Sequence, residues 1–425
     1  MASEAVGYGT LLRRNKAFRR LWYGQLVSQL GDWFDTIALY TLLLRLTGSG
    51  QAVGTLIVAQ FLPQTLVGLW GGVLIDRVPR KWVLIGTDVG RGLLVLLFLF
   101  VRDPSQVWII YVVTIFKVTL TALFEPARSA VIPLVTSNNE LIAANGIASA
   151  TWSAMLAIGA AIGGFVTGTL GITTALVIDS LSFLLSALLI STVPINETHL
   201  QRSTRSNGWQ DLREGARYLA SQRDVLLYAI VKGVWSLAGS VLLLLTLFGQ
   251  QVFPLGVDGA ISIGLLYAAR GVGAGVGPMI VGKWGGNSVR FLRHSIGPSF
   301  LISAIGYAAF AGSPTLLVAM LAATFAHLGG GAQWVSSTVL LQMQVPNRLQ
   351  GRVFAVELAL LTLATALSSY LLGIAADWDW SPRVLALIVA GSFVPSGIVL
   401  TWLLWREPRT ESQPAIALRE SVTEP

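Results

Sequence analysis

Long apolar segments alternate with short polar connections along almost the whole chain. A membrane-spanning α-helix needs about 20 predominantly apolar residues, and twelve segments fit this requirement. The connections hold Gly, Pro, Asp or Asn, which favour turns. The pattern therefore predicts an all-α integral membrane protein with twelve transmembrane helices. The predicted spans are residues 20–46, 51–75, 82–101, 106–130, 141–169, 171–193, 225–250, 258–282, 294–311, 314–342, 353–376 and 383–405.

The composition supports a membrane protein and excludes several other classes. Hydrophobic residues make up 54% of the 425 residues and charged residues 12%, about half the charged fraction of soluble globular proteins. The net charge of +8 would suggest nucleic-acid binding in a soluble protein. Here the basic residues lie in short loops, so we expect no nucleic-acid partner. The chain has no cysteine and three scattered histidines, so we expect no metal and no cofactor.

Lysine and arginine are distributed unevenly among the predicted loops. If both termini lie on one side, that side holds 22 of the 29 basic residues, and four more lie inside spans. The other side holds three, Arg45, Arg102 and Arg383. Short loops rich in basic residues stay cytoplasmic. We therefore expect a multi-pass protein of the cell (inner) membrane with both termini in the cytoplasm.

A polar segment in the middle of the chain separates two sets of six predicted helices. Within it, Trp209, Leu212, Ala216 and Leu219 recur at helical spacing between charged residues. This pattern predicts an amphipathic helix on the cytoplasmic membrane surface. The predicted organisation is an N-terminal six-helix bundle (1–195), a cytoplasmic linker (196–224), a C-terminal six-helix bundle (225–410) and a disordered tail (411–425).

The connection after the second predicted helix combines glycine, an acid and several bases. It reads Gly72-Val-Leu-Ile-Asp76-Arg77-Val-Pro79-Arg80-Lys81. Glycine permits close helix approach, and the cations suit an anionic leaflet. An ordinary positively charged cytoplasmic loop is the alternative. The segment resembles the signature of the major facilitator superfamily, with Pro79 where glycine is usual. The resemblance implies the major facilitator fold, two six-helix bundles around a central cavity.

Further segments resemble one branch of that superfamily, the drug and siderophore exporters related to macrolide-efflux and enterobactin-export proteins. These segments are Gly31-Asp32, Phe124-Glu125-Pro126-Ala127-Arg128, Ala144-Asn145, and residues 345–354. The resemblance implies export of a small molecule driven by a proton gradient. It also implies a cytoplasmic gate formed by Gly72, Asp76, Arg77, Arg80, Glu125 and Arg128.

The fifth predicted helix carries Gly159-Ala-Ala-Ile-Gly163-Gly164. This run resembles the antiporter motif of the exporters, with Ala160 in place of the usual proline. Small residues four apart permit close helix contact, and the eighth predicted helix repeats the spacing with the pairs Gly271/Gly275 and Gly273/Gly277. Two readings stay open: simple packing, or faces that slide when the two bundles rock.

Eight charged residues fall deep inside the predicted spans: Asp32, Asp35, Asp88, Asp179, Arg91, Lys117, Lys232 and Arg270. Each would cost about 2.5–3.5 kcal/mol if it faced lipid. They are therefore expected to face one another or a wet cavity. Asp88 and Arg91 lie three apart on one helix face, which predicts a local structural pair. Asp179 is given the same structural interpretation.

The first, fourth, seventh and tenth helices line the cavity in this fold. Asp32 and Asp35 share a face of the first, so the pair is expected to hold one proton over part of the physiological pH range. We favour Asp35 as the proton-coupling residue, because Gly31-Asp32 resembles a structural family element. An ion pair with Lys232 or Arg270 is the alternative. The candidates for proton coupling or the central cavity are Asp32, Asp35, Lys117, Lys232, Arg270 and His327.

Three of the candidates keep two readings. His327 titrates near neutral pH when unperturbed, or it is a hydrogen-bonded packing residue beside Gly329-Gly330-Gly331. Trp235 and Trp334 lie deep on cavity-lining helices, where they would stack on an amphipathic or cationic ligand or fill the core.

The sequence therefore predicts a monomeric proton antiporter that exports an amphipathic small molecule by alternating access. Its expected partners are the small-molecule substrate, protons and the lipid bilayer. A uniporter or a lysophospholipid flippase on the same fold is an alternative. From another class, a non-transporting sensor or scaffold also fits. A membrane enzyme does not, because no catalytic constellation is clustered near either interface.

Overall fold

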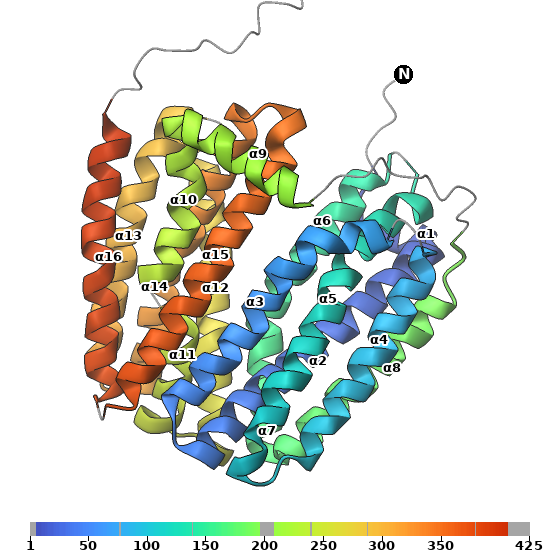
Figure 1. The fold of residues 1–425 in the computed structure, drawn as a ribbon, viewed down its shortest axis with the longest axis horizontal. Helices are drawn as coiled ribbons and strands as arrows, with labels where there is room; N and C mark the ends of the chain where they lie inside the picture. Colours follow the sequence, from blue (N-terminus) through green and yellow to red (C-terminus); the bar gives the residue numbers. More distant parts are fainter. Residues whose placement is uncertain are drawn as a thin grey trace, which may run out of the picture.

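The computed structural model describes residues 6–75, 78–137, 139–195, 208–238, 240–286, 288–378 and 380–406, with the backbone alone for 68–75. Helices account for nearly all of this chain (Figure 1), and no strand occurs in the described ranges.

Long helices occupy all twelve predicted positions. They are α2 (Lys16–Thr47), α3 (Gly50–Ile75), α4 (Arg80–Leu97), α5 (Val107–Val135), α6 and α7 (Leu141–Ala154 and Ala160–Leu170), α8 (Ile172–Ser191), α10 and α11 (Arg223–Ala238 and Val241–Leu247), α12 (Ala260–Gly285), α13 (Val289–Ala311), α14 (Leu316–Gln344), α15 (Asn347–Ala376) and α16 (Pro382–Trp405). A π-helical turn, η3 (Met155–Gly159), joins α6 to α7, and a second, η4 (Phe248–Val252), follows α11.

Nine of these helical stretches in the described chain are long and apolar enough to cross a membrane. The three others are α2, α3 and α13. Polar residues interrupt them, such as Asp32 and Asp35 in α2 and Arg293 in α13. The count of twelve spans therefore stays a prediction at these three helices, while the all-helical membrane architecture is confirmed.

The helices pack in two groups (Figure 1). Helices α2 to α8 contact one another chiefly through α2 with α8, α3 with α5, and α4 with α5 and α8. Helices α10 to α16 do so through α13 with α14 and α16, and α12 with α14. We call these the N-terminal group and the C-terminal group. Contacts of α3 with α15 and of α7 with α12 join them.

The predicted amphipathic helix is α9 (Gly208–Ser221), which lies at one end of the helical groups (Figure 1). It packs on the start of α15, where Arg352 contacts Asp211 at 2.8 Å and Glu214 at 2.9 Å. Leu219 is buried in this contact region. Residues 196–207 of the predicted linker and the predicted tail lie outside the described residues. We call this end of the molecule the α9 face and the other end the opposite face.

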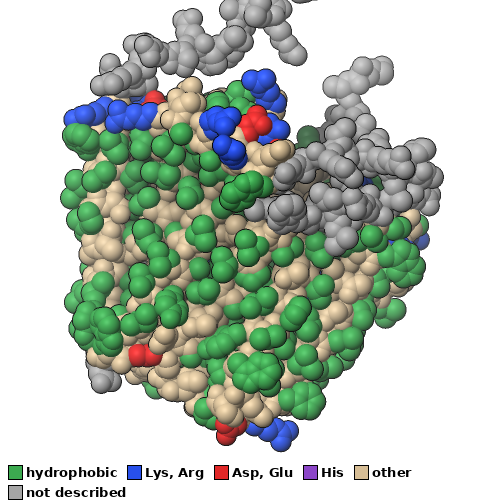
Figure 2. All heavy atoms as spheres, viewed as in Figure 1, with side chains coloured by type: hydrophobic (Ala, Val, Ile, Leu, Met, Phe, Trp, Pro, Cys, Tyr) green, Lys and Arg blue, Asp and Glu red, His purple; other side chains and the backbone are tan. Residues whose placement is uncertain are grey.

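The outer surface suits a lipid environment. Figure 2 shows apolar side chains over the sides of the molecule, with Lys and Arg gathered at the α9 face. The exposed large side chains include Phe100, Phe165, Leu188, Met279 and Ile398. Extended exposed apolar surface of this kind marks contact with a membrane or another apolar partner. With the nine apolar helices, it identifies a multi-pass membrane protein.

Glycines bring the two groups into backbone contact toward the opposite face. A Cβ on Gly164 of α7 would lie 2.6 Å from Cα of Gly264 in α12. A Cβ on Gly54 of α3 would lie 2.6 Å from the Ser369 carbonyl oxygen in α15. No side chain fits at such distances, so glycine is needed for these approaches. The close helix contact predicted for the fifth helix is confirmed.

Polar contacts complete this closure. The carboxylate of Asp377, at the end of α15, accepts hydrogen bonds from the Ser49 hydroxyl (2.5 Å) and the Gly50 N–H (2.7 Å). It thus caps the N-terminus of α3 from the other group, where helix N–H groups favour an anion. Arg45 and Asp258 form a second pair between the groups at 3.2 Å. The opposite face is therefore closed.

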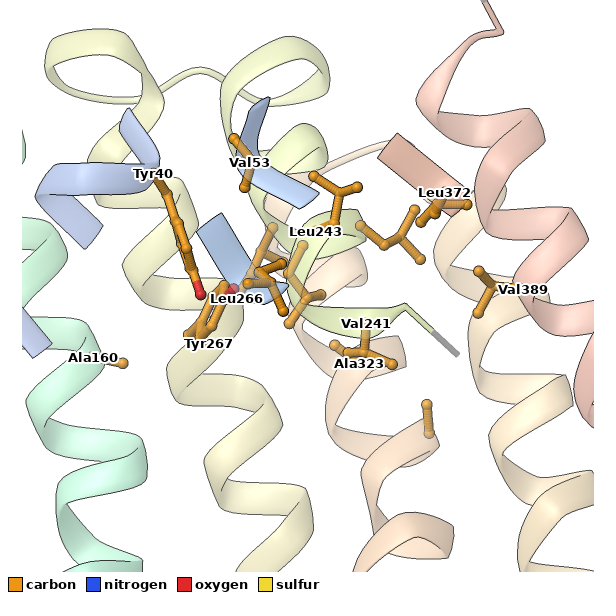
Figure 3. Packing of buried hydrophobic residues seen from close by; sticks show 14 of the residues in the cluster. Tyr40, Val53, Ala160, Val241, Leu243, Leu266, Tyr267, Ala323, Leu372 and Val389 are labelled. Carbon is orange, nitrogen blue, oxygen red and sulfur yellow. The ribbon is translucent and has the colours of Figure 1, made fainter. Parts of the chain in front are cut away.

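Tyr40 of α2 and Tyr267 of α12 approach each other inside this closed region (Figure 3), with ring centroids 6.2 Å apart. Both rings are buried. The Tyr40 hydroxyl donates to Gln60 at 2.8 Å, and the Tyr267 hydroxyl donates to the Leu242 carbonyl at 2.8 Å. The contact joins the two groups with satisfied polar atoms.

Candidate functional site

A cluster of three carboxylates surrounds one ammonium group inside the N-terminal group. Lys117 of α5 lies 2.5 Å from Asp35 and 3.0 Å from Asp32, both on α2. It lies 3.8 Å from Asp179 of α8. The three-residue spacing of the two α2 carboxylates puts them on one face, and that face turns toward α5 and α8. We call these four residues the acidic cluster.

The members of the acidic cluster differ in exposure. Asp179 and Asp35 have 0% and 4% of their side chains exposed, and Lys117 has 9%. Asp32 has 36% exposed. With all four ionised, the acidic cluster would carry two uncompensated negative charges in a poorly hydrated site, which is unfavourable. One bound proton reduces this excess, and Asp32 is the carboxylate that solvent or solute reaches most easily.

Asp179 joins the acidic cluster because α2 and α8 approach closely at Gly31. A Cβ on Gly31 would collide with the side chains of Asp179 and Ser182. The interpretation of Asp179 as part of a separate local pair is therefore corrected: its charged neighbour is Lys117. Gly31 has a structural role beside the acidic Asp32.

The local pair predicted between Asp88 and Arg91 of α4 is confirmed. Both side chains are fully buried, and the Arg91 guanidinium lies over the rings of Phe124 and Phe183. The Lys117 ammonium lies 5.3 Å from the ring centroid of Phe183. The pair therefore stands next to the acidic cluster without contacting its carboxylates.

A second ion pair lies inside the C-terminal group. Lys232 of α10 contacts Glu357 of α15 at 3.0 Å and donates to the Thr338 hydroxyl at 2.8 Å. Its ammonium lies 4.4 Å from the ring centroid of Trp334, which remains 44% exposed. The alternative ion pair of Lys232 with Asp32 is not formed in this state, because Lys232 pairs with Glu357.

Sequence reasoning missed Glu357. The eleventh helix was expected to begin at residue 353, which would place Glu357 at a membrane interface. Helix α15 begins at Asn347, so Glu357 lies almost three turns inside it and is buried. Residues 347–352 are polar, so the hydropathy pattern placed the start of the helix after them, although they belong to α15. The position of Glu357 opposite Lys232 required the tertiary structure.

Arg270 lies near the middle of α12. Among the described residues no carboxylate lies within 4.0 Å of its guanidinium, and its buried Nε has no hydrogen-bond partner. Tyr267 lies three residues before Arg270 on α12, and Gly273, three residues after it, packs on His327 of α14. The alternative pairing of Arg270 with Asp32 or Asp35 is therefore not formed in this state.

His327 and Trp235 contact each other in the C-terminal group. Their rings form an edge contact with centroids 5.5 Å apart, and Trp235 also packs on Phe393 at 5.6 Å. His327 Nδ1 lies 3.1 Å from the Ala323 carbonyl oxygen and 3.4 Å from the Tyr307 hydroxyl, and the carbonyl, which can only accept, favours the tautomer with the hydrogen on Nδ1. These contacts favour the packing interpretation for Trp235. His327 Nε2 has no partner among the described residues.

Glu125 and Arg128, two of the predicted gate residues, lie in the part of α5 toward the α9 face. Arg128 of α5 contacts Glu125 at 2.7 Å and donates to Gln25 of α2 at 2.9 Å. Arg80 donates to the Ala130 carbonyl at 3.5 Å. Gly72 lies in α3, while Asp76 and Arg77 lie outside the described residues. The structure therefore brings Arg128 and Glu125 together as predicted and leaves their relation to Asp76 a prediction.

A cavity of about 360 Å³ opens beside Arg128, between α5 and α6. Asn145, Ser149 and Trp152 line its other wall. Its lining mixes hydroxyl, amide, cationic and aromatic groups, which suits contact with an amphipathic solute.

The described chain thus consists of two helical groups that meet at the opposite face, with ion pairs inside both. The sequence pattern of the transmembrane secretion effector family matches residues 10–421. The chain belongs to this family. It is a member of the major facilitator superfamily, and it is a transporter and not an enzyme.

Proteins similar to this chain include exporters. A Bacillus subtilis (strain 168) protein named as a bacilysin exporter, BacE, is 26% identical over 400 residues, which cover 92% of this chain and 97% of that protein. Macrolide efflux protein A of Streptococcus pyogenes is 24% identical over 374 residues, covering 85% of this chain and 89% of that protein.

Solved structures confirm the fold. The nucleoside transporter NupG matches with a TM-score of 0.72 at 12% identity, covering 93% of this chain and 100% of that one. A bacterial homologue of the iron transporter ferroportin, in an inward-facing state, matches with a TM-score of 0.70 at 16% identity, covering 93% and 100%. The predicted major facilitator fold is thus confirmed.

Proposed function

We propose that this transporter exports an amphipathic small molecule in exchange for protons. The acidic cluster carries the proposal. Three carboxylates around one ammonium favour binding of a proton, and Asp32 is open enough to exchange it. A scaffold without transport would have no use for such a buried, charge-unbalanced site, which is costly to maintain in a membrane.

The proposed cycle uses the two helical groups as rocking units. The opposite face is closed by the glycine contacts and by Asp377 on the N-terminus of α3. In this state the acidic cluster releases a proton toward the α9 face, and the solute enters the central cavity. Opening of the opposite face then releases the solute, and a new proton binds the acidic cluster before the return.

We favour Asp32 over Asp35 as the residue that exchanges the proton. This replaces the preference drawn from sequence. Asp35 is buried and lies 2.5 Å from Lys117, whereas Asp32 has 36% of its side chain exposed. Asp35 then holds Lys117 in place. Arg128 and Glu125, together with Asp76 and Arg77, form the proposed gate at the α9 face.

The distribution of Lys and Arg indicates how the protein is oriented in the membrane. On the side shown in Figure 2, Lys and Arg gather at the α9 face, and basic loops stay in the cytoplasm. We therefore place both termini and α9 in the cytoplasm and the opposite face outside the cell (inner) membrane, with a monomer as the transporting unit. The names of the similar exporters support outward transport of a bacilysin-like or macrolide-like solute.

Everted membrane vesicles test the exchange. After acidification of the vesicle interior, we expect uptake of radiolabelled macrolide or bacilysin above the external concentration, and a protonophore should abolish it. Asp32→Asn is expected to lose this accumulation but to keep solute equilibration, because the exchangeable proton site is gone. Asp35→Asn is expected mainly to lower the melting temperature, because the partner at 2.5 Å from Lys117 is weakened.

Two outcomes would count against the exchange mechanism. Full gradient-driven accumulation in both variants would move proton coupling away from the acidic cluster. Solute equilibration by the parent protein with no response to the pH gradient would make it a uniporter. Variants are compared at equal amounts of folded protein, measured by size-exclusion chromatography.

Single cysteines test the orientation, and the chain supplies a clean background because it has none. Gln210→Cys places a thiol on α9, and Ser105→Cys places one at the start of α5; both parent side chains are exposed. In intact cells an impermeant maleimide should label Ser105→Cys and spare Gln210→Cys. The reverse pattern would invert the proposed topology.

A further inference from the structure

Arg270 differs from the other cations inside the helical groups in what it contacts. Lys117, Arg91 and Lys232 each contact at least one carboxylate. In the described parts of the chain, Arg270 contacts none within 4.0 Å, and its buried Nε has no hydrogen-bond partner. An unpaired charge inside a span is costly and therefore marks a functional site.

The surroundings of Arg270 supply the rest of a binding site. Tyr267 lies three residues before Arg270 on α12, and its ring packs on Tyr40 with centroids 6.2 Å apart. Gly273, three residues after Arg270, packs on His327, since a Cβ there would lie 2.8 Å from the His327 Cβ. His327 Nε2 is buried and has no partner among the described residues, and the Ala323 carbonyl beside Nδ1 favours the tautomer in which Nε2 accepts. A cation and a hydrogen-bond acceptor thus stand together in an aromatic setting.

We propose that Arg270 binds the carboxylate of the exported solute, and that His327 Nε2 accepts a hydrogen bond from an N–H or O–H group next to that carboxylate. The solute class is an apolar organic acid with such a donor, for example an N-acylated amino acid. The planar guanidinium matches a carboxylate in two parallel hydrogen bonds. This inference rests on the proposed export function and specifies its cargo.

A competing role for Arg270 is purely structural. In another state of the cycle it would pair with Asp32 across the cavity, since Asp32 is the most exposed carboxylate of the acidic cluster. The two roles make different predictions for binding of small acids, because a structural pair gives no preference for a carboxylate in the solute.

The first measurement needs no ligand. Arg270→Gln should leave the melting temperature of the purified protein unchanged or raise it, because it removes a half-buried cation that has no carboxylate partner in the described parts of the chain. The matched control is Arg91→Gln, which removes a buried cation that has a partner, Asp88, and should lower the melting temperature. Equal destabilisation by both variants would show that Arg270 has a structural partner and would overturn the proposal.

The second measurement uses matched acids and esters. N-decanoyl-alanine, N-decanoyl-serine and N-decanoyl-phenylalanine are compared with their methyl esters by isothermal titration in detergent. We expect the parent protein to bind at least one acid more tightly than its ester. Arg270→Gln should weaken that binding by about ten- to a hundredfold, the loss typical of a hydrogen bond to a charged group, and Arg270→Lys should weaken it less.

Three results would overturn the carboxylate site: no binding of any acid, equal binding of acids and esters, or unchanged binding by Arg270→Gln. These results are separate from those on the proposed function. Acid binding that depends on Arg270 without gradient-driven transport would keep the site and reject antiport. Antiport of a macrolide without acid binding would keep the function and reject the site.

Discussion

Replacing Lys117 with methionine is expected to abolish transport and to destabilise the protein. The ammonium group is the cation shared by Asp32, Asp35 and Asp179. Methionine keeps the apolar stem but leaves three carboxylates without a counter-charge. Removing one partner of a buried ion pair costs about 3–5 kcal/mol, and the carboxylates would take up protons to limit this cost. Solute transport and the thermal unfolding midpoint report the two effects.

Lys283→Met is the matched control, because Lys283 is an exposed lysine near the end of α12. It should leave both transport and unfolding close to those of the parent protein. If Lys117→Met were as stable and as active as Lys283→Met, the acidic cluster would be neither a structural nor a functional centre, and the proposed exchange mechanism would have to be abandoned.

Gly164→Val is expected to prevent closure of the opposite face. Its Cβ would lie 2.6 Å from Cα of Gly264, where backbone leaves no side chain that could turn away. Overpacking of this kind costs about 1–3 kcal/mol, and here the cost falls on the closed state alone. The variant should insert and fold, yet transport at no more than about one tenth of the parental rate, because each 1.4 kcal/mol is tenfold in a population.

Gly275→Val serves as the control for Gly164→Val. Gly275 lies on α12, and a Cβ there meets nothing within 4 Å. Transport by this variant should match that of the parent. Parental transport by Gly164→Val would mean that α7 and α12 need not come together during the cycle.

The helices were predictable because hydropathy in a membrane protein reports directly on spans. Each of the twelve predicted segments overlaps a long helix. Interruptions within the helices were harder to predict from the sequence. The π turn at Met155–Gly159 lies inside an apolar segment, where hydropathy gives no sign of an interruption. At this turn α12 approaches closely, since a Cβ on Gly271 would lie 2.8 Å from Ala157.

The charged residues of the candidate site could be predicted from the sequence better than the ion pairs that they form. Unpaired charges in spans are improbable, so Asp32, Asp35 and Lys117 were recognisable from sequence. Which cation meets which carboxylate depends on how far helices approach, and Gly31 decides that for Asp179. Asp377 could not be recognised, because an acid in a short loop looks like an ordinary turn until the N-terminus of α3 is placed against it.

The central claim is that protonation of the acidic cluster controls which face is closed. Its most direct test is a distance measurement by electron paramagnetic resonance in lipid nanodiscs. Spin labels at Ser105→Cys and Trp380→Cys sit on the opposite face, one in each helical group, and both parent side chains are exposed. Between pH 5 and pH 9 the protein should show a short and a long distance whose ratio changes with pH, and Asp32→Asn should hold that ratio constant. A ratio that does not respond to pH in the parent, or that responds equally in Asp32→Asn, would contradict the claim.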